Sequence, residues 1–240
     1  MDLDRYIELL RNDTERIAEI AESVDLRTKV VSCPEWTLGD LVYHVGEVHR
    51  FWQWVAAERI QQMAPDVEAP PRPQPADSDL VAWFRAGAAV LIDTLAQADP
   101  AVPVWSWTSQ HDMAFIQRRM PQETAVHRWD AESTAERINP IAGDLAADGI
   151  EEFFLLASAS PTSGDDRIGL SLSDTGDRWT AFVADQRMQL VPGASDEAAV
   201  LKGSASDLLL VLWRRLPLDS VRLEGDQEAA TRFLSLADLT

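Results

Sequence analysis

The spacing of apolar residues changes once along this chain of 240 residues. Up to about residue 140, apolar side chains recur three and four positions apart, as they do on one face of an α-helix. Beyond Pro140 they alternate with polar residues over short stretches, which is typical of β-strands. The pattern therefore predicts an α+β protein of two domains, with a four-helix bundle over residues 1–145 and a small α+β domain over residues 146–240.

Four helices are expected in the first domain. They cover residues 2–24, 38–63, 77–98 and 118–137. Thr37 is a suitable N-cap for the second helix, and Asp40 three residues later completes a capping box. Five prolines between residues 64 and 76 exclude a helix there, so we expect an extended surface connection.

The second domain is expected to mix short helices and strands. Helices are predicted over residues 149–159, 208–216 and 227–236, and strands over residues 168–172, 179–190, 198–201 and 221–225. Ser204 is a suitable N-cap for the middle helix, with Asp207 three residues later. This order of elements is typical of a small α+β domain.

Charge narrows the range of partners. The chain has 40 acidic and 21 basic residues and a formal net charge of -19, which repels phosphate backbones and anionic lipid surfaces. No apolar stretch approaches the roughly 20 residues that span a bilayer, and the N-terminus lacks the apolar region of a signal peptide. Cys33 is the single cysteine, which excludes an intramolecular disulfide. We therefore expect a cytoplasmic protein that binds small molecules rather than nucleic acid or membranes.

The histidines supply the first candidate chemistry. They stand at positions 44, 49, 111 and 127. Glu123 and His127 are four residues apart on one predicted helix, so their side chains lie one turn apart on nearly the same face, and Asp130 falls on the same stripe. Such a pair can share a divalent cation if a facing helix supplies a third ligand, although it is more commonly a plain surface pair. His44 and His49 both border the apolar stripe of the second helix, and spacing alone leaves the choice between them open.

Four segments resemble one known family. The sequences CPEWTLGDLVYHV at residues 33–45 and ETAVHRWDA at residues 123–131 resemble the two helix signatures of the mycothiol-dependent maleylpyruvate isomerase family. That family belongs to a DinB-like group of metal-binding four-helix bundles. The sequences LKGSASDLLL at residues 201–210 and VRLEGD at residues 221–226 resemble its C-terminal domain, which has a sterol-carrier-like fold. The resemblance thus spans almost the whole chain.

The resemblance implies a metal site and a thiol cosubstrate. Its ligand pattern maps onto His44, Glu123 and His127, and so selects His44 rather than His49. The implied cofactors are a divalent metal, with zinc expected, and mycothiol, a low-molecular-weight thiol. An arginine of the C-terminal domain serves the active site in the resembled isomerase, and it maps onto Arg215. Arg214 occupies the preceding place, where the family often has a small residue.

These implications lead to two readings of the function. The first is an isomerase or S-transferase in which the metal activates the thiol as a thiolate that attacks a small electrophilic, anionic substrate. The second is a non-catalytic module that binds a metal or a small molecule on the same scaffold. For Cys33 we expect a packed thiol rather than a nucleophile. The tryptophans at positions 105, 107 and 129 could wall a pocket, but core packing is the favoured interpretation.

Overall fold

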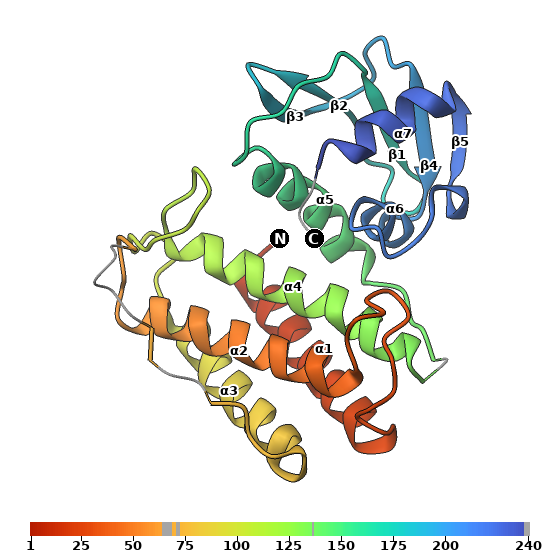
Figure 1. Cartoon of the computed structure of the whole chain (residues 1–240). Coiled ribbons are helices and arrows are strands. Elements are labelled where there is room, and N and C mark those ends of the chain that lie inside the picture. The colour runs from red at the N-terminus through yellow and green to blue at the C-terminus, as the bar shows by residue number, and fades with distance from the viewer. Residues whose placement is uncertain (64–68, 71–72, 136, 238–240) are drawn as a thin grey trace. The chain divides into compact units, whose positions relative to one another are not determined.

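The computed structural model describes residues 1–63, 69–70, 73–135 and 137–237, which form two compact units (Figure 1). The first unit comprises Met1–Ser106 with Gln110–Asn139, and the second comprises Trp107–Ser109 with the chain from Pro140 onward. The first is helical and the second is α+β, which confirms the predicted fold class. The sequence pattern places the domain boundary near residue 145, and the compact units part at Pro140.

Four long helices build the first unit. They are α1 (Leu3–Ser23), α2 (Leu38–Ala57), α3 (Asp77–Gln97) and α4 (Met113–Ser133). Helix α1 packs against α3 and α4, and α2 packs against the same two helices. Leu41 and Val45 of α2 lie in the fully buried core together with Ile17 and Phe84. No helix in the described part of the chain is long and apolar enough to cross a bilayer.

Side-chain caps fix where these helices begin. Asp2 accepts a hydrogen bond from the Arg5 backbone amide at 2.9 Å, and Thr37 forms the predicted capping box with Asp40. Asp112 caps α4, which therefore begins five residues earlier than the apolar spacing predicts. Thr37 and Asp112 therefore set the first residues of α2 and α4.

Two helix ends differ from the sequence expectation. Helix α2 ends at Ala57 rather than residue 63, because Arg59 takes a left-handed conformation with φ 51°. The amide of Ile60 then bonds to the Val55 carbonyl at 3.0 Å and closes the helix. Helix α4 ends at Ser133 rather than residue 137. Of the proline-rich connection, residues 64–68 and 71–72 lie outside the described residues, and residues 73–76 are not helical.

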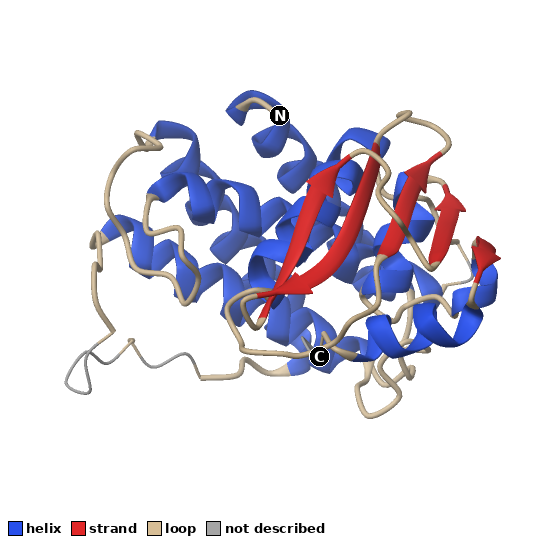
Figure 2. Ribbon diagram, turned by 90° about the horizontal axis from the view of Figure 1, so that it is seen from above, coloured by secondary structure: helices blue, strands red, loops and turns tan. Residues whose placement is uncertain are grey.

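The second unit is a five-stranded sheet with helices. Its elements are α5 (Gly143–Ala157), β1 (Ile168–Leu172), β2 (Arg178–Ala184), β3 (Arg187–Pro192), β4 (Ala199–Gly203), α6 (Ala205–Leu212), a 3-10 turn (Leu218–Ser220), β5 (Arg222–Gly225) and α7 (Gln227–Ser235). The strand order is β3-β2-β1-β4-β5. Strands β1 and β4 are parallel, and the other neighbouring pairs are antiparallel. Figure 2 shows the strands in red.

Residues in a left-handed backbone conformation also explain two differences between the predicted and the observed elements of this unit. Residues 179–190 read as one alternating run, but Asp185 and Gln186, with φ 50° and 62°, turn the chain back as a two-residue hairpin between β2 and β3. Helix α6 ends at Leu212 instead of residue 216, because Arg214 has φ 56°. Arg214 and Arg215 therefore follow the helix. Neither turn contains the glycine or asparagine that usually signals such a conformation.

A buried ionic network ties α4 to α1 and to the segment that leaves the bundle. The carboxylate of Glu132 accepts hydrogen bonds from Arg16 of α1 and Arg128 of α4, both at 2.7 Å, and from the Asn139 backbone amide at 2.8 Å. Burial alone would raise the pKa of Glu132, but these bonds outweigh it and hold the pKa below its ordinary value. Glu132 is thus an ionised carboxylate with donors on several sides.

Candidate metal centre

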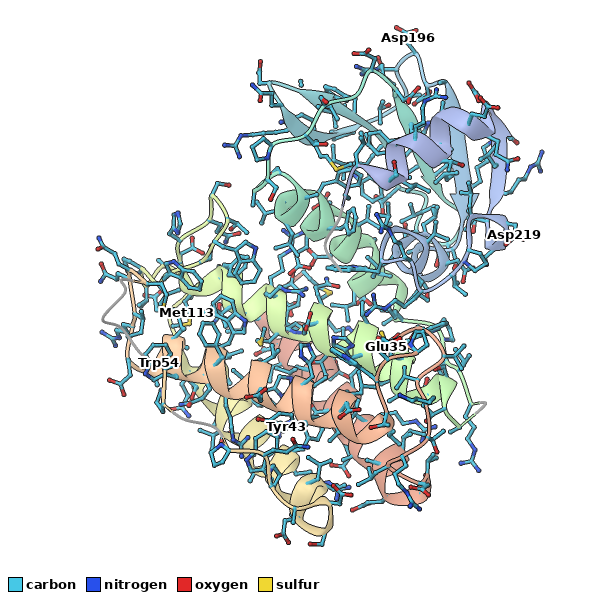
Figure 3. The ribbon with its side chains drawn as sticks, in the orientation of Figure 1. Glu35, Tyr43, Trp54, Met113, Asp196 and Asp219 are labelled. Carbon is cyan, nitrogen blue, oxygen red and sulfur yellow. The ribbon has the colours of Figure 1, made fainter. Side chains whose placement is uncertain are left out.

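The three predicted ligands converge between α2 and α4. His44 lies on the second turn of α2, directly after Tyr43, which Figure 3 labels, and Glu123 and His127 lie one turn apart on α4. The Nε2 atom of His44 is 3.5 Å from Glu123 Oε1, and the Nε2 atom of His127 is 3.3 Å from the same oxygen. One donor atom from each residue lies within 4.8 Å of the other two.

This geometry fits a divalent cation. Zinc–ligand bonds of about 2.0–2.2 Å at tetrahedral angles set neighbouring donor atoms about 3.3–3.6 Å apart. The two separations to Glu123 Oε1 fall in this range. Two imidazole nitrogens and one carboxylate oxygen are also a donor set that zinc uses when a coordination position is left for a substrate.

Hydrogen bonds behind His127 fix the orientation of its ring. His127 Nδ1 lies 3.0 Å from Asp130 Oδ2, and Ser32 donates a hydrogen bond to Asp130 Oδ1. Because Nδ1 is bonded to a carboxylate, Nε2 is the nitrogen that faces Glu123, an arrangement common behind metal-binding histidines. Asp130 falls on the stripe that the helical spacing predicts. Ser32 was missed, because it lies 98 residues away from Asp130 and no local pattern marks it.

Charges within the site shift two pKa values in opposite directions. Burial would raise the pKa of Glu123, but Arg119 and His127 outweigh burial and hold it well below its ordinary value. Burial would lower the pKa of His127, but Glu123 and Asp130 raise it to about 9. In the metal-free protein Glu123 is therefore ionised and His127 is protonated near neutral pH, so a cation that binds here displaces the proton of His127.

One aromatic side chain, that of Trp36, lies beside both histidines of the centre. The ring of Trp36, from the loop before α2, lies 4.7 Å from the His44 ring and 6.3 Å from the His127 ring, centroid to centroid. The two imidazole rings are 5.2 Å apart and nearly perpendicular. Cys33, three residues before Trp36, packs against the buried core of the helical unit, in line with the expectation of a packed thiol.

His49 occupies a different environment from His44. Its ring is fully buried and stacks on Phe84, and its Nε2 lies 2.8 Å from the hydroxyl of Thr124. That hydroxyl donates to the Met120 carbonyl, so His49 Nε2 is the donor of the pair. Burial lowers the pKa of His49 to about 3. His49 is thus a neutral structural side chain between α2 and α4, and it does not belong to the three-residue cluster.

The remaining candidates are divided between the two units. Trp105 stacks on Trp52 at 6.0 Å in the helical unit, Trp129 is buried on α4, and Trp107 is half exposed and clusters with the second unit. A pocket wall formed by the three tryptophans stays a prediction. Arg215 is half-buried, and its guanidinium donates to the Trp213 carbonyl at 3.0 Å. It belongs to the second unit, and its part in the chemistry stays a prediction.

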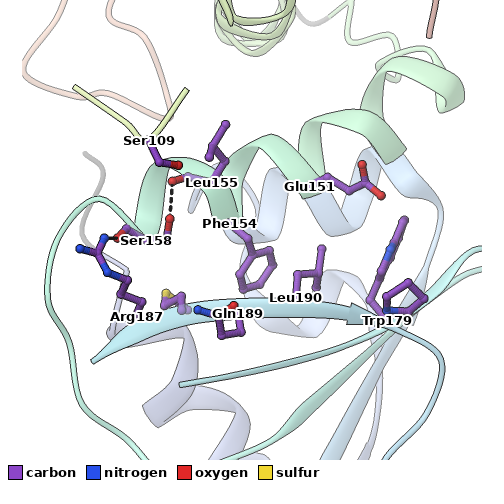
Figure 4. A pocket seen from close by; sticks show the side chains of 11 residues that line it. Ser109, Glu151, Phe154, Leu155, Ser158, Trp179, Arg187, Gln189 and Leu190 are labelled. Atoms are coloured by element: carbon purple, nitrogen blue, oxygen red, sulfur yellow. Dashed lines mark hydrogen bonds between the residues drawn. The ribbon is translucent and has the colours of Figure 1, made fainter. Parts of the chain in front are cut away.

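The second unit has a groove of its own, of about 530 Å³ (Figure 4). Phe154 and Leu155 of α5 line one side, and Trp179 of β2 and Leu190 of β3 line the other. Arg187 lies at its rim, with its guanidinium bonded to the Ser158 carbonyl at 2.6 Å. The volume is in the range of small-molecule sites. Arg215 is not among the lining residues.

Comparison with known protein families extends over both units. Residues 8–132 match the family model described as the mycothiol maleylpyruvate isomerase N-terminal domain, and residues 144–232 match the C-terminal domain of the same family. The chain belongs to the mycothiol maleylpyruvate isomerase family. All three candidate metal ligands of this family member lie within the N-terminal match, and Arg215 lies within the C-terminal match.

Solved structures agree with this assignment at the level of the fold. The mycothiol-dependent maleylpyruvate isomerase has a TM-score of 0.64 to this chain, and a mutant of that enzyme has a TM-score of 0.66. In both comparisons the sequence identity is 14%, and the match covers 94% of this chain and 95% of the other. No curated protein sequence matches the chain significantly.

The first prediction concerns metal retention by single-histidine variants. His44→Ala removes one of three donors, so the purified protein should lose at least about nine-tenths of its bound divalent metal. His111→Ala changes an exposed loop histidine and should keep the wild-type content. Elemental analysis after dialysis measures both. Equal metal content in His44→Ala and His111→Ala would show that His44 is not a ligand.

The second prediction concerns the pH dependence of stability. In the unfolded chain His49 takes up a proton below about pH 6.5, whereas in the folded protein its pKa is about 3. The contribution of His49 to stability therefore decreases as the pH falls from about 6.5 toward 3, and at pH 5 the decrease is about 2 kcal/mol.

Urea denaturation at pH 7 and pH 5 tests this sign. His49→Gln keeps a donor for Thr124 but cannot titrate, so it should lose about 2 kcal/mol less than the wild type between the two pH values. His111→Gln serves as the control with wild-type pH dependence. An unchanged loss in His49→Gln would contradict the assignment of a buried neutral histidine.

Proposed function

We propose that this family member is a metal- and thiol-dependent enzyme, an isomerase or S-transferase that uses mycothiol on a small electrophilic, anionic substrate. The observation that carries the proposal is the convergence of His44, Glu123 and His127 on one point with donor separations suited to zinc. The membership of the family supports the choice of mycothiol as the thiol.

The surroundings of the three donors support an open rather than a closed metal site. The side chain of His44 is 36% exposed, whereas Glu123 is 14% and His127 is 8% exposed. Access to the centre is therefore on the His44 side, where a thiol could enter. A bound divalent cation would supply a Lewis acid that lowers the pKa of that thiol toward neutral.

The protein's own groups would determine the charge and shape of the site. Glu123 is the single anionic donor among the three, so a dication held here keeps a net positive charge that favours a thiolate over a thiol. Asp130 holds the His127 ring in place, and the Trp36 ring lies beside both imidazoles. The thiolate sulfur would add to an electrophilic carbon of the substrate. In an isomerisation, addition to a conjugated double bond permits rotation before the same sulfur leaves.

A non-catalytic binding module remains the second candidate, and the groove between α5 and β3 favours it. That groove lies wholly in the second unit and needs no metal. A protein that only bound a small molecule there would have no use for three converging donors with an exposed side. The two candidates therefore differ in whether a thiol interacts with the metal.

The third prediction tests this difference with cobalt in place of zinc. When mycothiol is added to the cobalt-loaded protein, a thiolate-to-metal charge-transfer band should appear in the near ultraviolet. His44→Ala and Glu123→Gln should not give the band, and His111→Ala should. A cobalt-loaded wild type that shows no band with mycothiol would favour the non-catalytic module.

The fourth prediction concerns Arg215, for which we propose the role of binding the substrate carboxylate. Arg215→Met should lower kcat/KM for maleylpyruvate about 50-fold, the loss typical of one charged hydrogen-bonded contact, with unchanged metal content. Arg214→Met is the neighbouring control and should keep most of the wild-type value. Equal effects of the two substitutions would remove Arg215 from the mechanism.

A further inference from the structure

The two carboxylate oxygens of Glu123 face different partners. Oε1 lies 3.5 Å from His44 Nε2 and 3.3 Å from His127 Nε2, at the point where the three donors converge. Oε2 is paired with a guanidinium nitrogen, Nη2, of Arg119. Only one oxygen of the carboxylate is therefore directed at the candidate metal position.

Arg119 is placed for this contact by the helix itself. It precedes Glu123 by four residues on α4, so both side chains lie on the same face one turn apart. The side chain of Arg119 is only 9% exposed. A guanidinium with so little access to water would be left without a compensating partner if it left the carboxylate, so the pair is held more firmly than a surface pair.

The number of oxygens that Glu123 donates matters for the chemistry. Carboxylates bind divalent cations through one oxygen or through both. With three protein donors, a second oxygen from Glu123 would fill a position that a catalytic metal leaves for its substrate. An open coordination position therefore requires a neighbouring group that holds this second oxygen away from the cation.

We propose that Arg119 is a positioning residue that occupies Oε2 of Glu123 and so restricts the carboxylate to one metal-binding oxygen. The coordination position kept open in this way is the one that the thiol takes. This inference rests on the proposed metal-dependent function, and it assigns to Arg119 control of the coordination number rather than contact with the substrate.

A purely structural role of Arg119 predicts the opposite effect on metal affinity. If Arg119 only supported the local structure, its loss would weaken metal binding. In the proposed role, its loss removes a cation from beside a dication and frees a second donor oxygen, so metal binding stays equal or becomes up to about tenfold tighter. Thiol binding should weaken at the same time, because the open position is filled.

The experiment compares cobalt-loaded full-length variants by visible absorption, metal affinity and mycothiol titration. In Arg119→Met the visible absorption should fall about two-fold or more, as expected when the coordination number rises. Its metal affinity should be equal or higher, and its mycothiol affinity should be at least about tenfold lower. Arg119→Lys keeps a cation beside Oε2 and should restore most of the wild-type spectrum.

Two further variants separate this effect from charge and folding. Arg118→Met removes the same charge from a residue turned about 100° around α4, and should keep the wild-type spectrum. If circular dichroism shows that Arg119→Met is misfolded, Arg119→Gln, which is neutral but retains a donor, should show the same changes to a smaller extent.

Different results would overturn the role of Arg119 and the metal-dependent function. A folded Arg119→Met or Arg119→Gln with the wild-type spectrum, or with weakened metal binding, overturns the role of Arg119 alone. A wild-type protein that binds no metal overturns the proposed function, whatever the Arg119 variants do.

Discussion

The structure of the helical unit depends on one constraint: the polar side chains of a buried helix must find hydrogen-bonding or charged partners. Helix α4 is buried over most of its circumference, yet many of its buried residues are polar or charged: Gln117, Arg119, Gln122, Thr124, His127, Arg128, Asp130 and Glu132. A charge that is buried without a partner destabilises a fold by several kcal/mol, so the surrounding elements must supply partners at defined places. Arg16 of α1 bonds to Glu132, His49 of α2 bonds to Thr124, and Ser32 bonds to Asp130. These contacts set the position of α4 against two helices and one loop.

The same constraint prepares the candidate metal centre before any cation binds. The hydrogen bond between His49 and Thr124 joins α2 to α4 next to Glu123, and His44 lies on the same helix as His49. Asp130 and Ser32 hold the His127 ring from behind. Side chains that are already held by hydrogen bonds lose little freedom when they bind a ligand, which is the advantage of a preorganised site. The polar residues of α4 therefore serve both the stability of the bundle and the geometry of the centre.

The family relation is visible in the fold although few residues are shared. At 14% identity the two solved isomerase structures still match 94% of this chain, because a bundle and a small sheet tolerate many apolar exchanges that keep volume and pattern. Donor atoms that must meet at one point have no such freedom, because each must lie within bond length of a single position. The three donors of the candidate centre thus carry more functional information than the apolar core that surrounds them.

Much of the fold and part of the candidate site could be predicted from the sequence alone. The change of periodicity at Pro140 predicted the helical part and the α+β part, Thr37 predicted the start of α2, and the four-residue spacing of Glu123 and His127 placed both on one face. These features act within one or two helical turns, so local residues suffice to predict them. The resemblance of two helix segments to a known family supplied the choice of His44, which spacing had left open.

Other features were decided only by the folded chain. Helix α2 ends at Ala57 and helix α6 at Leu212 because Arg59 and Arg214 adopt left-handed conformations. Neither residue is a glycine, which is the usual sequence signal for such a conformation. The burial of His49 against Phe84 and the contact of Ser32 with Asp130 join residues that are far apart in sequence. The physical reason is that such contacts depend on how whole elements pack, and the free energy of that packing is shared among many side chains rather than encoded in any short segment.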